Sequence, residues 1–207
     1  MASNYTVQAQ VVDIGTDTPQ SGDIFLVDTN VWLWQTYAPA TTPGAVSRSR
    51  LRTIAVYLTY INNALNVGAT LCYSGLSLAE LAHNIEKLEQ RNSPYGSISL
   101  KEYRHNYPSE RARVVAEVQA SWGQVNNIAI PESLLIDDLT INRALQRFQN
   151  QMLDGYDLYI LETMQGIQGI TGVITDDGDY VTAPGITVFT LNSAAIAAAQ
   201  VQGRLGR

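Results

Sequence analysis

Residues 23–30 of the chain read DIFLVDTN. The four consecutive apolar residues at 24–27 are typical of a short strand that is buried on both faces of a parallel sheet. Polar residues begin abruptly at Asp28 and continue to Asn30. Because ligands bind beyond the carboxyl ends of strands in open α/β sheets, this position predicts that Asp28 belongs to a functional site.

Working outward, similar apolar runs alternate with segments of helical periodicity. Further strands are predicted at residues 69–73, 172–175 and 186–191. Helices are predicted at 50–65, 77–88, 109–122, 140–152 and 156–165, with a short terminal helix capped by Asn192 or Ser193. This alternation predicts an α/β fold with a central, mostly parallel sheet flanked by helices.

The composition limits the class of protein. The chain has 207 residues, of which 45% are hydrophobic, and this is enough for one domain with a real core. No apolar run is long enough for a transmembrane helix, and the first residues lack the pattern of a signal peptide. The single cysteine, Cys72, cannot form a disulfide within the chain, so a cytoplasmic location without membrane association is expected.

Charge is distributed unevenly along the chain. The net charge of −6 excludes a uniformly basic nucleic-acid-binding surface. Residues 1–47 and 148–203 contain no lysine or arginine, whereas eleven of the 13 basic residues lie between Arg48 and Arg147. If the two acidic ends of the chain meet in space, they form a concentrated carboxylate site.

Two kinds of carboxylate stand out. Asp28 and the pair Asp176 and Asp177 follow predicted strands, whereas Glu80 and Asp157 are embedded among apolar residues of predicted helices. A buried acid is costly without a partner, and clustered acids raise one another's pKa. A bound Mg²⁺ or Mn²⁺ would relieve this repulsion, because both ions prefer oxygen ligands.

In this order and at these spacings, four motifs resemble those of PIN-domain ribonucleases, which include the VapC-type toxins. The motifs are VDTNV at 27–31, SLAE at 77–80, DLYI at 157–160 and ITDDGDY at 174–180. The resemblance implies a PIN-like fold and Mg²⁺- or Mn²⁺-dependent cleavage of RNA. It also implies that the metal is bound by four catalytic acids: Asp28, Glu80, Asp157 and Asp177.

The same resemblance assigns supporting roles and boundaries. Asn30 and Thr175 match polar residues that steady the first and last carboxylates, while Asp176 and Asp179 are neighbouring acids with a less direct role. The PIN-like domain would span residues 23–207, after an irregular N-terminal arm at 1–22. A helical and loop-rich insertion would occupy about 86–150, which makes the chain longer than typical toxins.

Each acid also has a purely structural interpretation. Asp28 could cap the next segment, and Glu80 could complete a capping box with Ser77. Asp157 could be an acid in the first turn of its helix, where the helix dipole stabilises a negative charge. Residues 175–179 could form an ordinary acidic turn. Asp154 competes with Asp157 for the helical position, although an apolar run follows Asp157 directly.

RNA binding requires local cations on this acidic chain. The first candidate group is Arg48, Arg50 and Arg52. A second basic stretch lies between residues 87 and 113, interleaved with Tyr95, Tyr103 and Tyr107, but its cations could instead pair with neighbouring glutamates.

Several functions remain open at this point. The leading hypothesis is a metal-dependent endoribonuclease that is the toxin of a toxin–antitoxin pair, with an antitoxin as partner and a homodimeric state implied by the resemblance. The alternatives are an RNA-processing nuclease without an antitoxin and a catalytically inactive PIN-fold interaction module. A phosphatase with Asp28 as nucleophile is less favoured, because such enzymes need an acid two residues later and this chain has Asn30.

Overall fold

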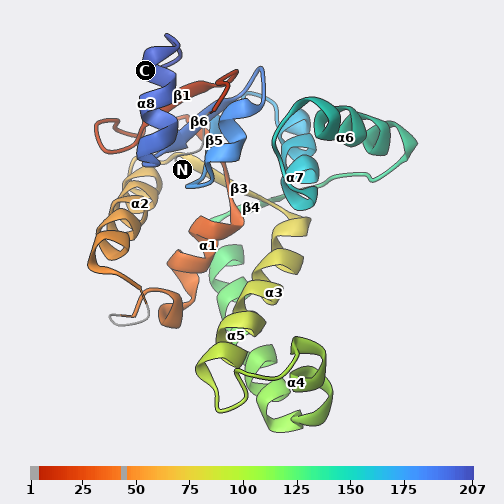
Figure 1. The fold of residues 1–207 in the computed structure, drawn as a ribbon. Coiled ribbons are helices and arrows are strands. Elements are labelled where there is room, and N and C mark those ends of the chain that lie inside the picture. The colour runs from red at the N-terminus through yellow and green to blue at the C-terminus, as the bar shows by residue number, and fades with distance from the viewer. Residues whose placement is uncertain (1–4, 43–45) are drawn as a thin grey trace.

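A computed structural model describes residues 5–42 and 46–207. Its centre is a six-stranded sheet in the order β1-β6-β5-β2-β3-β4, and every pair of neighbours is parallel (Figure 1). The strands are β1 (Gln10–Asp13), β2 (Ile24–Val27), β3 (Thr70–Ser74), β4 (Ile130–Glu132), β5 (Gly172–Ile174) and β6 (Thr187–Thr190). The predicted α/β class with a parallel sheet is therefore confirmed.

Alternate residues of the central strands face two separate hydrophobic clusters. Phe25 and Val27 of β2 point into one cluster and Leu26 points into the other, and all three are fully buried. The first cluster is covered by α1 (Thr29–Thr36), α2 (Arg48–Asn66), α3 (Gly75–Asn92) and α5 (Pro108–Ile128). The second is covered by α6 (Asp138–Asn150), α7 (Gly155–Gly166) and α8 (Ser193–Val201). Burial on both faces explains why β2 reads as a continuous apolar run.

The N-terminal segment contributes to the sheet, which the sequence did not predict. Residues 10–13, expected within an irregular arm, form β1 and pair with β6. On the other side of β1, Val11 forms an isolated parallel bridge with Leu205, near the C-terminus. The expectation of an arm does not hold for these residues, and residues 1–4 of that segment lie outside the described part of the chain.

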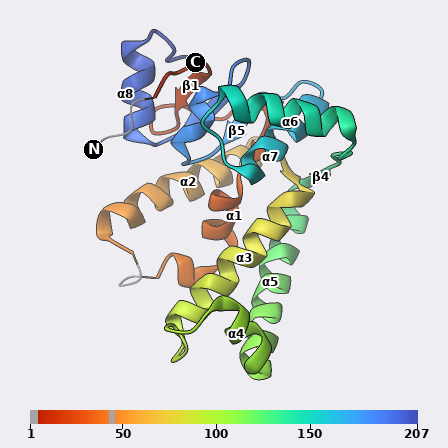
Figure 2. The ribbon, with the colours of Figure 1, turned by 45° about the vertical axis from the view of Figure 1, so that its right-hand side comes forward.

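Three helical details also differ from the expectations. Residues 100–106 form α4 (Leu100–Asn106) inside the segment expected to be a loop, at the far end of α3 and α5 from the sheet (Figure 2). The helix α5 begins at Pro108 and extends to Ile128, beyond the predicted end. The side chain of Ser74, and not that of Ser77, caps α3, so the predicted capping box is wrong.

Short 3₁₀ turns are η1 (Ala38–Ala40) and η2 (Gly178–Thr182).

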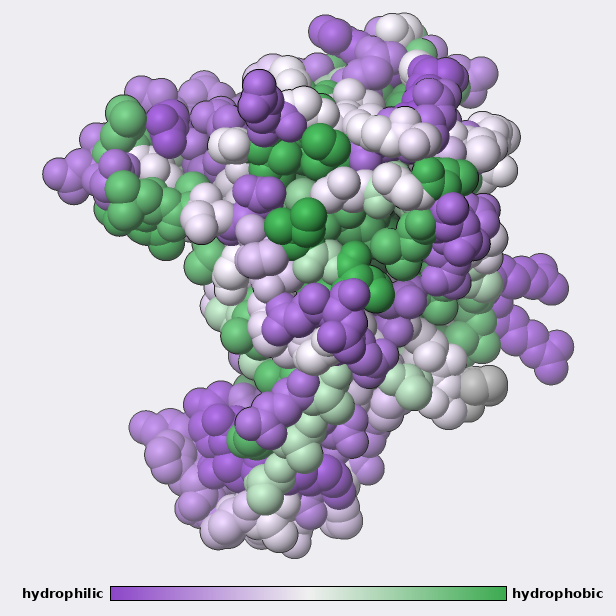
Figure 3. All heavy atoms as spheres, turned by 180° about the vertical axis from the view of Figure 1, so that it is seen from behind, coloured by the Kyte–Doolittle hydropathy of each residue, from purple (hydrophilic) through white to green (hydrophobic). Residues whose placement is uncertain are grey.

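The helix α6 presents an unusual surface. Its buried side holds Thr140 and Ala144, while the large apolar side chains of Ile141, Leu145 and Phe148 are exposed on one face. Figure 3 shows hydrophobic side chains at the upper left, over the end of the molecule where α6 lies. Within the described ranges, no helix is long and apolar enough to cross a membrane.

Candidate active site at the carboxyl end of the sheet

The candidate site lies where the order of strands reverses. The chain runs from β2 to its neighbour β3 on one side, while β5 enters the sheet on the other side of β2. The register pairs Val27 with Ile174, and the backbone N–H of Asp28 donates to the carbonyl oxygen of Ile174 at 3.0 Å. The residues that follow β2 and β5 therefore lie side by side, at the position where parallel sheets bind ligands.

Asp28 is buried and held by three donors. One carboxylate oxygen accepts the backbone N–H of Thr29 at 2.7 Å, which also makes Asp28 the cap of α1. The other accepts the Asn30 amide and the Thr175 hydroxyl, each at 2.6 Å. The structure thus brings together the three residues Asp28, Asn30 and Thr175, as expected. Asn30 donates to Asp28 and is not the acid that a phosphatase needs two residues after its nucleophile, so the geometry gives no support to a nucleophilic Asp28.

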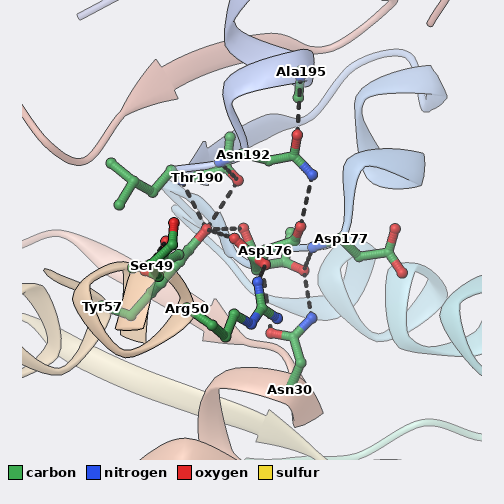
Figure 4. Close-up of polar contacts among 12 residues, drawn as sticks. Asn30, Ser49, Arg50, Tyr57, Asp176, Asp177, Thr190, Asn192 and Ala195 are labelled. Atoms are coloured by element: carbon green, nitrogen blue, oxygen red, sulfur yellow. Dashed lines mark hydrogen bonds and ion pairs between the residues drawn. The ribbon is translucent and has the colours of Figure 1, made fainter. Parts of the chain in front are cut away.

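The adjacent acids after β5 diverge. Asp176 forms an ion pair with Arg50 and accepts the Tyr57 hydroxyl at 3.0 Å, while its carbonyl oxygen accepts the side chain of Asn192 (Figure 4). The side chain of Asp177 points the opposite way in the same view and caps η2, accepting the N–H of Asp179 at 2.8 Å. Asp176 therefore belongs to a network that fixes the start of α2, whereas Asp177 faces the other acids.

Asp157 reaches the site from α7. The N-cap of this helix is Asp154, and Asp157 lies one turn inside with 6% of its surface exposed. One of its carboxylate oxygens accepts the hydroxyl of the fully buried Tyr180 at 2.8 Å. Tyr180 was missed by sequence reasoning, although its place at the end of the ITDDGDY motif was the available signal.

Glu80 reaches the site from α3 without a comparable partner. Among the described residues, its Oε2 atom is buried without a hydrogen bond of good geometry, and the same holds for the hydroxyls of Thr29 and Ser77, although Thr29 and Asn84 are near enough to lower the pKa of Glu80. Ser77 lies inside α3 and does not cap it. An orphaned buried oxygen is rare in folded proteins and calls for a ligand or other explanation.

The acids raise one another's pKa. Burial raises the pKa of Asp28, and the charges of Glu80 and Asp177 add to the effect. Burial also raises the pKa of Asp157, with contributions from Asp28, Asp154 and Asp177. The pKa of Glu80 is raised by burial and by Asp154 and Asp177. The four predicted acids therefore share one electrostatic site, to which Asp154 also contributes.

The oxygen donors of these acids suit a hard divalent cation, but the positions of the side chains do not form a set of metal ligands. The donors are carboxylate oxygens, they repel one another, and Glu80 has an uncommitted oxygen. Such a set suits Mg²⁺ or Mn²⁺. Within residues 5–42 and 46–207, however, no group of three histidine, cysteine, aspartate or glutamate side chains could hold a metal ion as it stands. Binding would require some of these side chains to turn.

The two predicted cationic regions differ in the contacts that their arginines make. Arg50 packs its guanidinium over the Trp34 ring at 4.6 Å and pairs with Asp176, so it lies beside the acids. Arg48 and Arg52 are exposed on α2. In the second basic stretch, Arg104 and Arg111 pair with Glu86, as the structural interpretation expected.

The chain was compared with family models, curated sequences and solved structures. No protein-family model matches the chain, and no curated protein sequence matches it. Among solved structures, it is similar to the crystal structure of VapBC2 from Rickettsia felis bound to a DNA fragment from their promoter. The TM-score is 0.46 and the identity 13%, over 81% of this chain and 98% of that chain. A likeness of this size carries no argument about the site, which rests on its own geometry.

Proposed function

We propose that this chain is a PIN-like, metal-dependent endoribonuclease that hydrolyses RNA phosphodiester bonds. The observation that carries the proposal is the convergence of Asp28, Glu80, Asp157 and Asp177 at the switch point of the sheet, with raised pKa values for the first three. Strongly perturbed carboxyl groups in one place are typical of functional sites. The motif resemblance provides the reaction class.

The chain's own residues would divide the work. Asp28, fixed by its three donors, and Asp177, fixed by the N–H of Asp179, would anchor Mg²⁺ or Mn²⁺ from the two adjacent strand ends. Glu80 and Asp157 would complete the ligand set from the two helices. A cation bound there would supply Lewis-acid chemistry, stabilising charge on the phosphate and making a water molecule more acidic.

Arg50 is the cation best placed to meet the RNA backbone. It lies next to the acids, its side chain is 42% exposed, and Asp176 and Trp34 restrict its conformation. An arginine held in this way can bind a phosphate at little conformational cost. Arg48 and Arg52 are also exposed on α2, but residues two positions apart in a helix do not share a face, so they lie on a different side of α2 from Arg50.

The test is cleavage of a labelled RNA pool with Mn²⁺, with Mg²⁺ and with chelator. We expect metal-dependent cutting by the native chain and its loss in Asp28→Asn and Asp177→Asn. Asp138→Asn, an exposed acid on α6, is the matched control and should cut normally. Thermal unfolding gives a second measurement: Mn²⁺ should raise the melting temperature of the native chain and of the control only. Cutting that persists in chelator would refute the proposal.

Partners remain part of the proposal. The name of the similar structure describes a VapBC complex, and we propose a protein antitoxin as partner for this chain, together with a homodimeric state and a cytoplasmic location. Co-purification of the native chain with the product of an adjacent small gene, and inhibition of cleavage by that product, would test the toxin assignment. Cleavage without such a partner would favour an RNA-processing role.

A further inference from the structure

A cavity adjoins the candidate active site on the side of the N-terminal segment. Its volume is about 360 Å³, within the range of small-molecule sites in proteins. The lining comes from three segments that are far apart in the sequence: Tyr5, Thr6 and Gln8, then Asn150 and Met152, and finally Asp179 and Thr182 of η2.

The N-terminal wall of this cavity is held in place. The Gln202 side chain accepts the N–H of Val7 at 2.9 Å and donates to the carbonyl oxygen of Tyr5 at 2.8 Å. The N–H groups of Gln8 and Ala9 donate to the carbonyl oxygen of Val181. Both ends of residues 5–9 are therefore fixed, to α8 and to η2 respectively.

Tyr5 lies directly against the acidic turn. A Cβ atom added to Gly178 would come within 2.2 Å of the Tyr5 hydroxyl, so only glycine fits between Asp177 and Asp179 with Tyr5 in this position. The N–H of Asp179 donates to the carboxylate of Asp177. The cavity and the candidate active site thus share one short turn, η2.

The lining has the chemistry of a nucleobase site. Tyr5 offers an aromatic ring and Met152 an apolar side chain that is 74% exposed. The amide of Gln8 and the hydroxyl of Thr6 supply neutral donors and acceptors, and Asn150 offers its amide oxygen, since its N–H donates to the carbonyl oxygen of Gln146. The carboxyl of Asp179 adds an acceptor. Proteins recognise single-stranded RNA by stacking bases on aromatic rings and by hydrogen bonding to base edges with such groups.

We propose that this cavity binds one unpaired nucleobase next to the phosphate that is cleaved, with Tyr5 as its stacking surface and the amides of Gln8 and Asn150 selecting its edge. This inference rests on the proposed function for its biological meaning. It makes the N-terminal segment a specificity determinant, which a structureless arm could not be.

Free nucleosides test the site independently of cleavage. They carry no phosphate, so the acids do not repel them and no cation is needed. Binding of adenosine, guanosine, cytidine and uridine to the full chain would be measured by saturation-transfer NMR, with chelator present. We expect at least one nucleoside to bind in the millimolar range and Tyr5→Ala to weaken it fivefold or more, given the usual strength of base stacking.

The matched control is Tyr95→Ala. Tyr95 stacks on Tyr107 at 3.8 Å between ring centroids, beside α4 and far along the chain from the cavity. This variant should bind nucleosides like the native chain. Gln8→Ala should change which nucleoside is preferred, without loss of the fold, because the backbone N–H of Gln8 makes the contact to Val181.

The outcomes separate this inference from the proposed function. Nucleoside binding that depends on Tyr5, in a chain that cuts no RNA, would support the cavity and refute the nuclease. Metal-dependent cutting by a chain whose nucleoside binding is absent, or unchanged in Tyr5→Ala, would refute the cavity alone. Absence of both activities would refute both.

Discussion

Replacing Asp157 by asparagine should stabilise the metal-free protein while removing its response to metal. The substitution keeps the shape of the side chain, and the amide oxygen can still accept the Tyr180 hydroxyl. What it removes is a buried carboxyl whose pKa is raised to about 9 by burial and by Asp28, Asp154 and Asp177, so that the native chain must take up a proton to fold at pH 8.

The magnitude follows from the cost of burying a polar group that is only partly compensated, here by the hydroxyl of Tyr180. That cost is about 1–3 kcal/mol, and a domain of this size shifts its melting temperature by roughly 2–4 °C per kcal/mol. We therefore expect Asp157→Asn to melt several degrees higher than the native chain at pH 8 with chelator. Mn²⁺ should raise the melting temperature of the native chain but not of the variant.

The raised pKa of Asp157 determines how the stability difference between the native chain and the variant changes with pH. Because the folded-state pKa of Asp157 lies above its unfolded value, the folded state binds more protons between the two values. Stability contributed by this group is present at low pH, falls as the pH rises above about 4, and levels off once the folded-state carboxyl has ionised. The advantage of the variant should therefore grow with pH. A variant that is less stable than the native chain at pH 8, or that keeps the full Mn²⁺ response, would refute the reasoning.

Three further predictions concern residues around the site. Tyr180→Phe removes the hydroxyl that donates to Asp157 and should weaken Mn²⁺ binding about tenfold or more, measured by calorimetry. Tyr60→Phe removes a hydroxyl that donates to Asp17 and should leave Mn²⁺ binding unchanged. Arg50→Ala should weaken RNA binding and reduce its salt dependence, with the Mn²⁺-induced melting shift retained, and loss of that shift would contradict its role at the phosphate. Glu162 is a fully buried carboxylate of α7 that pairs with Arg143 and Arg147 of α6. Glu162→Gln removes both ion pairs and should lower the free energy of unfolding by about 3 kcal/mol or more, measured by urea titration.

Much of the central fold could be predicted, because the signals are local. The strand β2 is a continuous apolar run, and β3, β5 and β6 have buried apolar residues next to one another in the sequence. The helix α2 shows helical periodicity, and the apolar residues of α7 lie within its predicted bounds. The exposed three-residue strand β4 contains Pro131 and gives no such signal. Likewise, β1 is only four residues long and is defined by its pairing with β6, a contact across the whole chain.

The candidate site was predictable as a list of acids but not as a geometry. The motif resemblance selected Asp177 as the acid of the last motif, yet it could not show that Asp176 turns toward Arg50 and Tyr57. That divergence depends on α2, which is over a hundred residues away. Ser77 failed as a cap because Ser74, at the end of β3, reaches the helix first. Alternatives of this kind are decided by tertiary packing, which periodicity does not encode.

The acids of the site differ in how completely the protein satisfies them, and this gradient bears on their roles. Asp28 accepts three hydrogen bonds, Asp157 accepts one from Tyr180, and Oε2 of Glu80 is buried without a partner in the described part of the chain. A fully bonded carboxylate is rigid, while an unsatisfied one carries a free-energy cost that a ligand can remove. Asp28 is therefore suited to fix the position of a cation, and Glu80 gains most from its arrival. Because Glu80 lies on α3, which also contacts α1 and α7, binding there would tie together the helices on opposite sides of the sheet.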